Sequence, residues 1–208
     1  MSNAFVSKDK NIIYRNNHRR RFLIFVLICC LLCRTLASCR TKADVSALGI
    51  LEVMVAAASS AAGNVYVLPS SPSAEQLSDT SAQGAVRARI ASDALLVAAF
   101  GKSELSNEDH DFSSFLYALV DDGALRFSTG GVPCEYVVFH CVSRSDTEHL
   151  TTLLLERKEA LRRQYRDSEH APSVEQAQVV VIGKYVIFAL CSDAEAAVDA
   201  AASAIGKS

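Results

Sequence analysis

The sequence predicts an α+β fold, with an antiparallel sheet of about three to four strands and helices packed mainly on one face. Two patterns in the C-terminal third lead to this prediction. Three runs rich in β-branched and aromatic residues, at 135–142, 177–182 and 185–191, are typical of strands. Two other segments, 146–167 and 192–205, have the leucine spacing or the alanine content of helices. Together they predict a strand-helix-hairpin-helix unit.

The run from Glu135 to Val142 is expected to be a central strand. It follows Gly130, Gly131 and Pro133, which mark a turn before it. Its residues are apolar on both faces, which favours a strand covered on both sides over one at the edge of the sheet.

A long amphipathic helix is expected after this strand, ending near Asp167. Ser145 and Glu148 match a capping box, in which each side chain satisfies a free backbone N–H. The charged side chains are expected to lie in solvent, with Glu159 paired to Arg163 four residues later. The side chains of the opposite face recur every three or four residues: Leu150, Leu153, Leu154, Arg157, Leu161 and Tyr165.

The last three elements are expected to be a tight hairpin and a closing helix. Gly183 and Lys184 separate two strand-like runs, and glycine supplies the positive φ that a two-residue hairpin turn requires. Ser192 and Glu195 match a second capping box, which opens an alanine-rich helix that extends to about Ile205. Its small side chains allow this helix to lie close against a sheet.

This C-terminal stretch resembles the ending of a family of uncharacterised bacterial lipoprotein-like proteins, catalogued as domain of unknown function four-three-five-eight. The resemblance covers about the last third of the chain. It implies a lipoprotein-type N-terminus, and it brings no activity and no catalytic residues with it. The segments that carry it are Glu135–Val142, the helix from Asp146, the turn Gly183-Lys184-Tyr185, and Ser192-Asp193-Ala194.

The middle of the chain has weaker patterns. Residues 112–120 fit a strand or a helix, and the comparison with the family favours a strand. Asp121, Asp122 and Gly123 are then expected to form a turn. For the remaining segments we expect a helix at 44–62, an extended stretch at 65–68, a loop at 69–84, a helix at 85–100 and a polar loop at 102–111.

The charges are divided unevenly along the chain. Residues 1–39 carry seven basic residues and one acidic residue, whereas the rest of the chain carries 14 basic and 22 acidic residues. An acidic body is repelled by a phosphate backbone, so nucleic acid is disfavoured as a partner. The basic N-terminal part is better explained as a targeting segment.

The N-terminal segment has the organisation of a lipoprotein signal peptide. A basic stretch, Arg15–Arg21, precedes the apolar run Phe22–Cys33. Twelve helical residues span about 18 Å, which is shorter than the roughly 30 Å hydrocarbon core but suits the apolar region of a signal peptide. Leu36-Ala37-Ser38-Cys39 matches a lipobox, in which the thiol of Cys39 receives a diacylglyceryl group. Two acyl chains are enough for stable membrane anchoring.

The domain organisation follows from this interpretation. Residues 1–39 are expected to be signal peptide and lipid anchor, and residues 40–208 a single domain on the extracytoplasmic side of the cell membrane. One alternative is an uncleaved anchor from Phe22 to Ala37, with Arg34 reaching the membrane surface. The other is a chance apolar segment. The first two interpretations place the domain in the same compartment.

The cysteines offer few candidates for chemistry. Cys29, Cys30 and Cys33 lie in the apolar run, and Cys39 is the lipidation site of the leading interpretation. The remaining three are interpreted first as buried free thiols, with one disulfide as the alternative and a nucleophile as the least favoured role. These three are Cys134, Cys141 and Cys191.

Metal and cofactor sites have weak support in the sequence. His140, Glu148 and His149 form a loose set without the spacing of a metal motif. His140 and Cys141 are strand neighbours and should point to opposite faces. The acidic stretch from Glu108 to Asp111 lacks the spacing of a calcium loop. No catalytic, cofactor-binding or metal-binding residue is therefore assigned.

Two functions follow from the sequence. The first is a membrane-anchored extracytoplasmic lipoprotein that binds an unidentified protein or small molecule, without a cofactor. The alternative is a cell-envelope enzyme with an unrecognised site, which would use Cys134 or the Glu108–Asp111 loop. A purely structural role, in a developmental programme, is a third interpretation.

Overall fold

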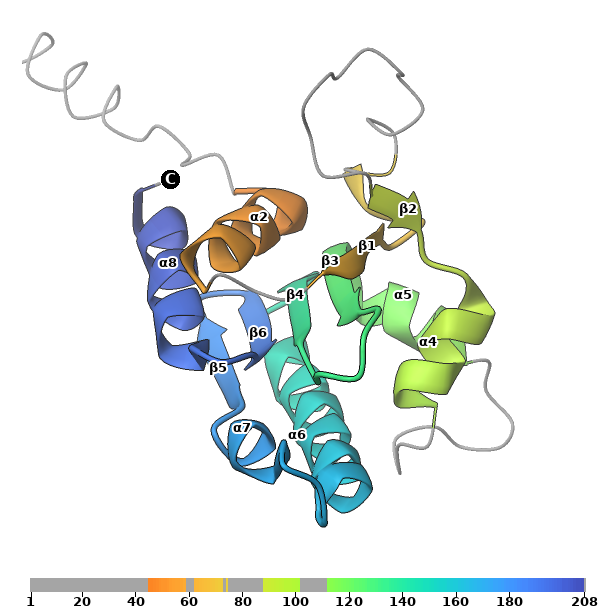
Figure 1. Ribbon diagram of the computed structural model, residues 1–208. Helices are drawn as coiled ribbons and strands as arrows, with labels where there is room; N and C mark the ends of the chain where they lie inside the picture. The colour runs from red at the N-terminus through yellow and green to blue at the C-terminus, as the bar shows by residue number, and fades with distance from the viewer. Residues whose placement is uncertain (1–44, 59–61, 73, 75–87, 102–111, 208) are drawn as a thin grey trace, which may run out of the picture. The chain divides into compact units, whose positions relative to one another are not determined.

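The computed structural model describes residues 45–58, 62–72, 74, 88–101 and 112–207, and these residues form a six-stranded sheet with helices on both faces (Figure 1). The strand order is β2-β1-β3-β4-β6-β5. All neighbouring strands are antiparallel except β1 and β2, which are parallel. The strands are β1 (Gly63–Val67), β2 (Ala88–Ile90), β3 (Val120–Ser128), β4 (Glu135–Cys141), β5 (Gln178–Ile182) and β6 (Tyr185–Leu190).

The helices divide between the two faces of the sheet. One face packs against α2 and α8, and the other against α4, α5, α6 and α7. Figure 1 shows α2 lying next to α8. The helices are α2 (Ala47–Ala57), α4 (Asp93–Phe100), α5 (Phe112–Leu119), α6 (Asp146–Tyr165), α7 (Ala171–Glu175) and α8 (Ala194–Lys207).

This architecture confirms the α+β class and corrects its details. The sheet has more strands than predicted and is mixed, because the short strands β1 and β2 pair in parallel. The prediction that helices pack mainly on one face was wrong. The two helices on the second face, α2 and α8, contain many alanines, and their buried side chains pack on that face of the sheet.

Strand β4 is central, as predicted, and all seven of its residues are buried. Val137 and Phe139 point to the face with α6, whereas Tyr136 and Val138 point to the face with α2 and α8. A strand covered on both sides needs apolar residues at consecutive positions, so the continuous apolar run is explained by the two helical layers.

The C-terminal hairpin also forms as predicted. Strands β5 and β6 pair from Gln178 with Ala189 to Ile182 with Tyr185, which leaves Gly183 and Lys184 as the turn. Gly183 has a φ of 64°, in the left-handed region that glycine adopts at no steric cost. The hairpin places β6 beside β4 and leaves β5 at the edge of the sheet.

Residues 112–123 were predicted wrongly. The segment expected to be a strand is the helix α5, in which Phe112 and Leu116, one turn apart, are buried together. The expected turn at 121–123 lies inside β3, where the pairing with β4 shifts between Val120 and Asp122. Such a β-bulge inserts an extra residue into one strand and redirects its side chains.

Residues 85–100 do not form one helix. Within the described part of this segment, β2 occupies 88–90 and α4 begins only at Asp93. The hydroxyl of Ser92 accepts a hydrogen bond from the N–H of Leu95, 3.3 Å away, so Ser92 caps the helix. The helix expected at 44–62 is α2, which spans Ala47–Ala57. The stretch expected to be extended at 65–68 lies largely in strand β1.

Neither predicted capping box forms. Ser145 has helical backbone angles and no capping hydrogen bond, and the Asp146 carboxylate instead accepts from the N–H of Ser143 at 2.8 Å. At the start of α8 the cap is Asp193, whose carboxylate accepts from the N–H of Ala196 at 3.0 Å. Asp193 therefore caps α8, whereas Asp146 bonds to the backbone just before α6.

Several predictions lie outside the described residues: the anchor and Cys39 within 1–39, the acidic loop at 102–111 and most of the loop at 69–84. The described elements all belong to a compact unit that begins at Asp44. Within the described residues, no helix combines the length and apolar character needed to span a membrane.

Candidate functional site

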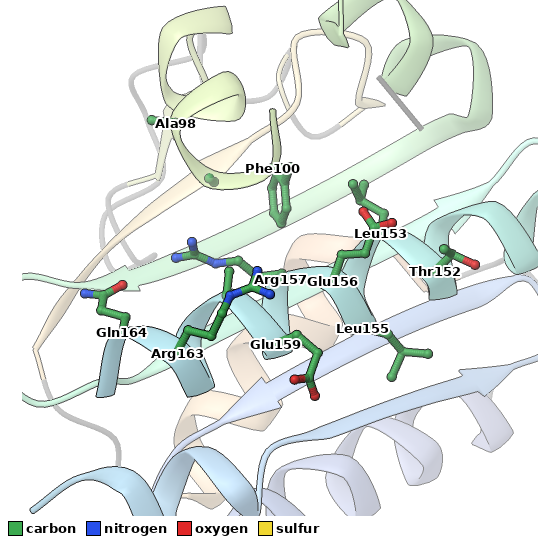
Figure 2. A pocket seen from close by; sticks show the side chains of 12 residues that line it. Ala98, Phe100, Thr152, Leu153, Leu155, Glu156, Arg157, Glu159, Arg163 and Gln164 are labelled. Carbon is green, nitrogen blue, oxygen red and sulfur yellow. The ribbon is translucent and has the colours of Figure 1, made fainter. Parts of the chain in front are cut away.

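A groove of about 700 Å³ lies between the end of α4 and one side of α6. Figure 2 shows side chains of both helices around it. Apolar carbon atoms and charged groups share its lining, which is typical of a binding surface with some polar selectivity. Its lining residues include Ala98, Ala99 and Phe100 from α4, and Leu155, Glu156, Arg157, Ala160, Arg163 and Gln164 from α6.

Helix α4 supplies the apolar side of the groove. Its inner residues Leu96 and Phe100 are buried in the core, yet Val97 on its outer side is 47% exposed. On α6, Leu155 lines the same groove and is 48% exposed. A helix that is apolar on all sides is usually covered on all sides, so the outer side of α4 has the character of a contact surface.

The charges of α6 that line the groove differ in whether they already have partners. Arg157 is fully engaged with Glu135 on strand β4. Its Nε and Nη2 atoms donate to the two carboxylate oxygens of Glu135 at 3.0 and 2.6 Å, and both side chains are mostly buried. This bidentate pair fixes α6 against the sheet, and the charge of Arg157 is therefore neutralised within the chain.

Arg162 joins α6 to α7. It donates to Glu159 at 2.6 Å and makes two hydrogen bonds to the carboxylate of Glu175. The hydrogen bonds from Arg162 lower the pKa of Glu175 below its ordinary value, and the bonds to Glu175 and Glu159 raise the pKa of Arg162. The predicted pair of Glu159 with Arg163 was wrong, because Arg162, three residues from Glu159, takes that place.

Glu156 and Arg163 are the two charged groups that remain among the described residues lining the groove. The Oε2 atom of Glu156 is buried and has no hydrogen-bond partner. Arg163 is exposed, and within the described part of the chain it makes no hydrogen bond or ion pair. Figure 2 shows both side chains extending from α6. The groove therefore offers one acceptor and one cation to a binding partner.

A second polar cluster lies at the β-bulge. The Nδ1 atom of His140 is 2.6 Å from Oδ1 of Asp121, and the His140 ring lies 4.6 Å from the ring of Tyr185. The hydroxyl of Tyr185 donates to the carbonyl oxygen of Val45 at 2.7 Å, just before α2. These contacts attach α2 to the sheet. Cys141, the neighbour of His140, lies on the opposite face, as predicted.

The three described cysteines confirm the prediction of buried free thiols. Burial, reinforced by the nearby carboxylates of Asp146 and Asp121, raises the pKa of Cys141 to about 12. A thiol that stays protonated at neutral pH is a poor nucleophile. Cys134 is 3% exposed and accepts a weak hydrogen bond from Arg126 at 3.9 Å. Its burial argues against a catalytic role for Cys134, whereas the Glu108–Asp111 loop of the enzyme alternative lies outside the described residues.

The candidate metal set is not brought together. His140 is buried on β4 beside Asp121, whereas Glu148 and His149 are exposed near the start of α6. In the residues that the structure describes, no group of three or more histidine, cysteine, aspartate or glutamate side chains could hold a metal ion.

The groove was not predicted from the sequence. Glu156 and Arg163 were interpreted as part of a solvated face, and residues 93–100 as part of a longer helix at 85–100. One signal was present: residues 94–100, Ala-Leu-Leu-Val-Ala-Ala-Phe, are apolar without interruption. A helix of this composition cannot bury every side against one sheet.

Comparison with known proteins found no relative of this chain. No family model, curated protein or solved structure matches the chain. The resemblance to domain of unknown function four-three-five-eight therefore stays a prediction.

Proposed function

We propose that this protein is a lipoprotein, held by Cys39 to the extracytoplasmic side of the cell membrane, whose folded domain is an interaction module. The lipobox Leu36-Ala37-Ser38-Cys39 is the observation that supports this proposal most. It follows a basic stretch and a short apolar run, which is the order of a lipoprotein signal peptide. The compact unit begins at Asp44, only a few residues after Cys39. A lipid on Cys39 would leave this unit intact.

The groove between α4 and α6 supports binding rather than catalysis. Its described lining includes apolar side chains, the Oε2 atom of Glu156 without a hydrogen bond, and Arg163, which has no partner among the described residues. No cysteine or histidine is among the described residues that line it. Thr152, a lining residue with a hydroxyl, donates its hydrogen bond to the backbone carbonyl oxygen of Glu148 at 3.1 Å rather than to a general base.

The experiment compares the full chain with Cys39→Ala by intact mass and by partition between membrane and soluble fractions. We expect the wild type to begin at Cys39 with the mass of a diacylglyceryl group, and the variant to lack that mass. Cys33→Ala is the matched control, since it removes a thiol from the apolar run and should still be processed.

Two outcomes would contradict this assignment. If both proteins retain residues 1–38 and stay in the membrane, the segment from Phe22 to Ala37 is an uncleaved anchor and Cys39 carries no lipid. If both are full length and soluble, the protein has no membrane anchor.

A further inference from the structure

Glu156 and Arg163 have opposite charges and no partner among the residues that the structure describes, and they lie on the same side of α6. Seven residues separate them, which corresponds to about two helical turns and roughly 10.5 Å along the axis. Side chains on a helix pair at spacings of three or four residues. These two therefore do not neutralise each other, although both line the same groove.

We propose that this groove binds a second copy of the same chain, with the two α6 helices antiparallel about a twofold axis near Glu159 and Ala160. This inference rests on the proposed function, because it names the partner of the same groove. In such a contact residue i of one copy meets residue j of the other, and the reverse. Glu156 of each copy then meets Arg163 of the other.

The two charges are complementary in exposure as well as in sign. The Oε2 atom of Glu156 is buried in the wall of the groove and lacks a donor, and buried acceptors are rarely left without one. Arg163 is exposed and carries its donors at the end of a long side chain. An arginine from a second copy can therefore enter the groove and donate to this carboxylate.

Residues near the proposed axis permit close approach. Ala160 is small and lines the groove. Glu159 would lie near Glu159 of the second chain, but the charge of each is already neutralised by Arg162 of its own chain, 2.6 Å away. A parallel arrangement would instead place Glu156 against Glu156 and Arg163 against Arg163. The charge pattern therefore selects the antiparallel arrangement.

Apolar contacts would accompany the charge pairs. Leu155 is 48% exposed and lines the groove beside the end of α4, and Val97, which precedes the lining residue Ala98, is 47% exposed. Covering such side chains removes apolar surface from water, which is the main driving force of most protein association. The charge pairs then determine which surfaces meet and in which direction.

The test uses two copies of the full chain with different tags, co-expressed and extracted from membranes with detergent micelles in excess over protein. We expect wild-type copies to co-isolate. Arg163→Glu in both copies places two glutamates together at each contact, and Glu156→Arg in both copies places two arginines together. Each should weaken self-association by about tenfold or more.

The decisive sample mixes the two variants. A copy with Arg163→Glu presents two glutamates, and a copy with Glu156→Arg presents two arginines, so every contact between them joins opposite charges. We expect this mixed pair to co-isolate at least as well as the wild type. Arg144→Glu, an exposed charge reversal outside the groove, should leave association unchanged.

Circular dichroism of each variant separates lost association from lost folding. The inference is overturned if wild-type copies do not co-isolate, as they would not if a different protein occupied the groove. It is also overturned if the folded mixed pair associates no better than either variant alone. The mass of Cys39, measured in the same samples, reports independently on the lipid anchor.

Discussion

The carboxylate of Asp122 accepts a hydrogen bond from the backbone N–H of Ala47, 2.7 Å away and 75 residues earlier in the chain. Ala47 is the first residue of α2, and Ser46 caps the same end by accepting from the N–H of Gly49. A buried carboxylate at the β-bulge thus accepts a hydrogen bond from a free backbone N–H at the start of α2.

We expect Asp122→Ala to lower the free energy of unfolding by about 1–2 kcal/mol, the usual effect of removing a helix cap. Asp122→Asn retains an acceptor oxygen and should lose less. Chemical denaturation measures both variants. Asp199→Ala, an exposed aspartate on α8, is the control and should stay near the wild type. An equal loss in Asp122→Ala and Asp199→Ala would contradict this role.

The pair of Arg157 and Glu135 gives the second prediction. Their side chains are only 17% and 11% exposed, so Arg157→Ala leaves a largely buried carboxylate without its cation. We expect a loss of about 3 kcal/mol in the free energy of unfolding. The double variant Glu135→Leu with Arg157→Met removes both charges and should recover much of this loss. Additive effects of the two changes would argue against coupling.

The raised pKa of Cys141 predicts a loss of stability in alkali. The pKa is raised by burial from 9.0 to about 12, so the folded state holds its proton at a pH where the unfolded chain releases it. The free energy of unfolding should therefore be unaffected below pH 9 and fall between pH 9 and about 12. Cys141→Ala should show a shallower fall over this range. Equal slopes in both proteins would refute the prediction.

The lowered pKa of Glu175 depends on Arg162. The hydrogen bond from Arg162 is its main cause, so Arg162→Ala should return the pKa of Glu175 toward its ordinary value. Carboxyl titration by NMR measures this change, with Glu195, an exposed glutamate on α8, as reference. The contribution of this ion pair to folding stability is present above the ordinary pKa of glutamate and is lost as the pH falls through the lowered pKa of Glu175. Both groups are exposed, so salt should weaken it.

Strands β4, β5 and β6 and helix α6 could be predicted because their patterns are local. The apolar run 135–142, the Gly183-Lys184 turn and the leucine spacing of α6 each depend on neighbours in the sequence. The capping boxes failed although the helices formed. Asp146 accepts from the N–H of Ser143 and Asp193 from the N–H of Ala196, and a sequence motif cannot show which of several neighbouring polar side chains makes each hydrogen bond.

Residues 120–128 could not be predicted because distant residues decide their conformation. Asp121-Asp122-Gly123 has the composition of a turn, yet the hydroxyl of Ser71 bonds to the N–H of Gly123 at 2.7 Å and Ala47 bonds to Asp122. These contacts hold the segment in a bulged strand. The groove could not be predicted for the same reason, since α4 and α6 meet only in the folded chain.

The neighbouring positions of α2 and α8 have a consequence for the order of assembly. During synthesis α2 emerges early, whereas α8 is made last among the described helices. β3, β4 and α6 follow one another closely and can associate through contacts that are short in sequence, which generally form fast. The layer of α2 and α8 must wait for the chain to be nearly complete. We therefore expect this layer to close after the opposite one.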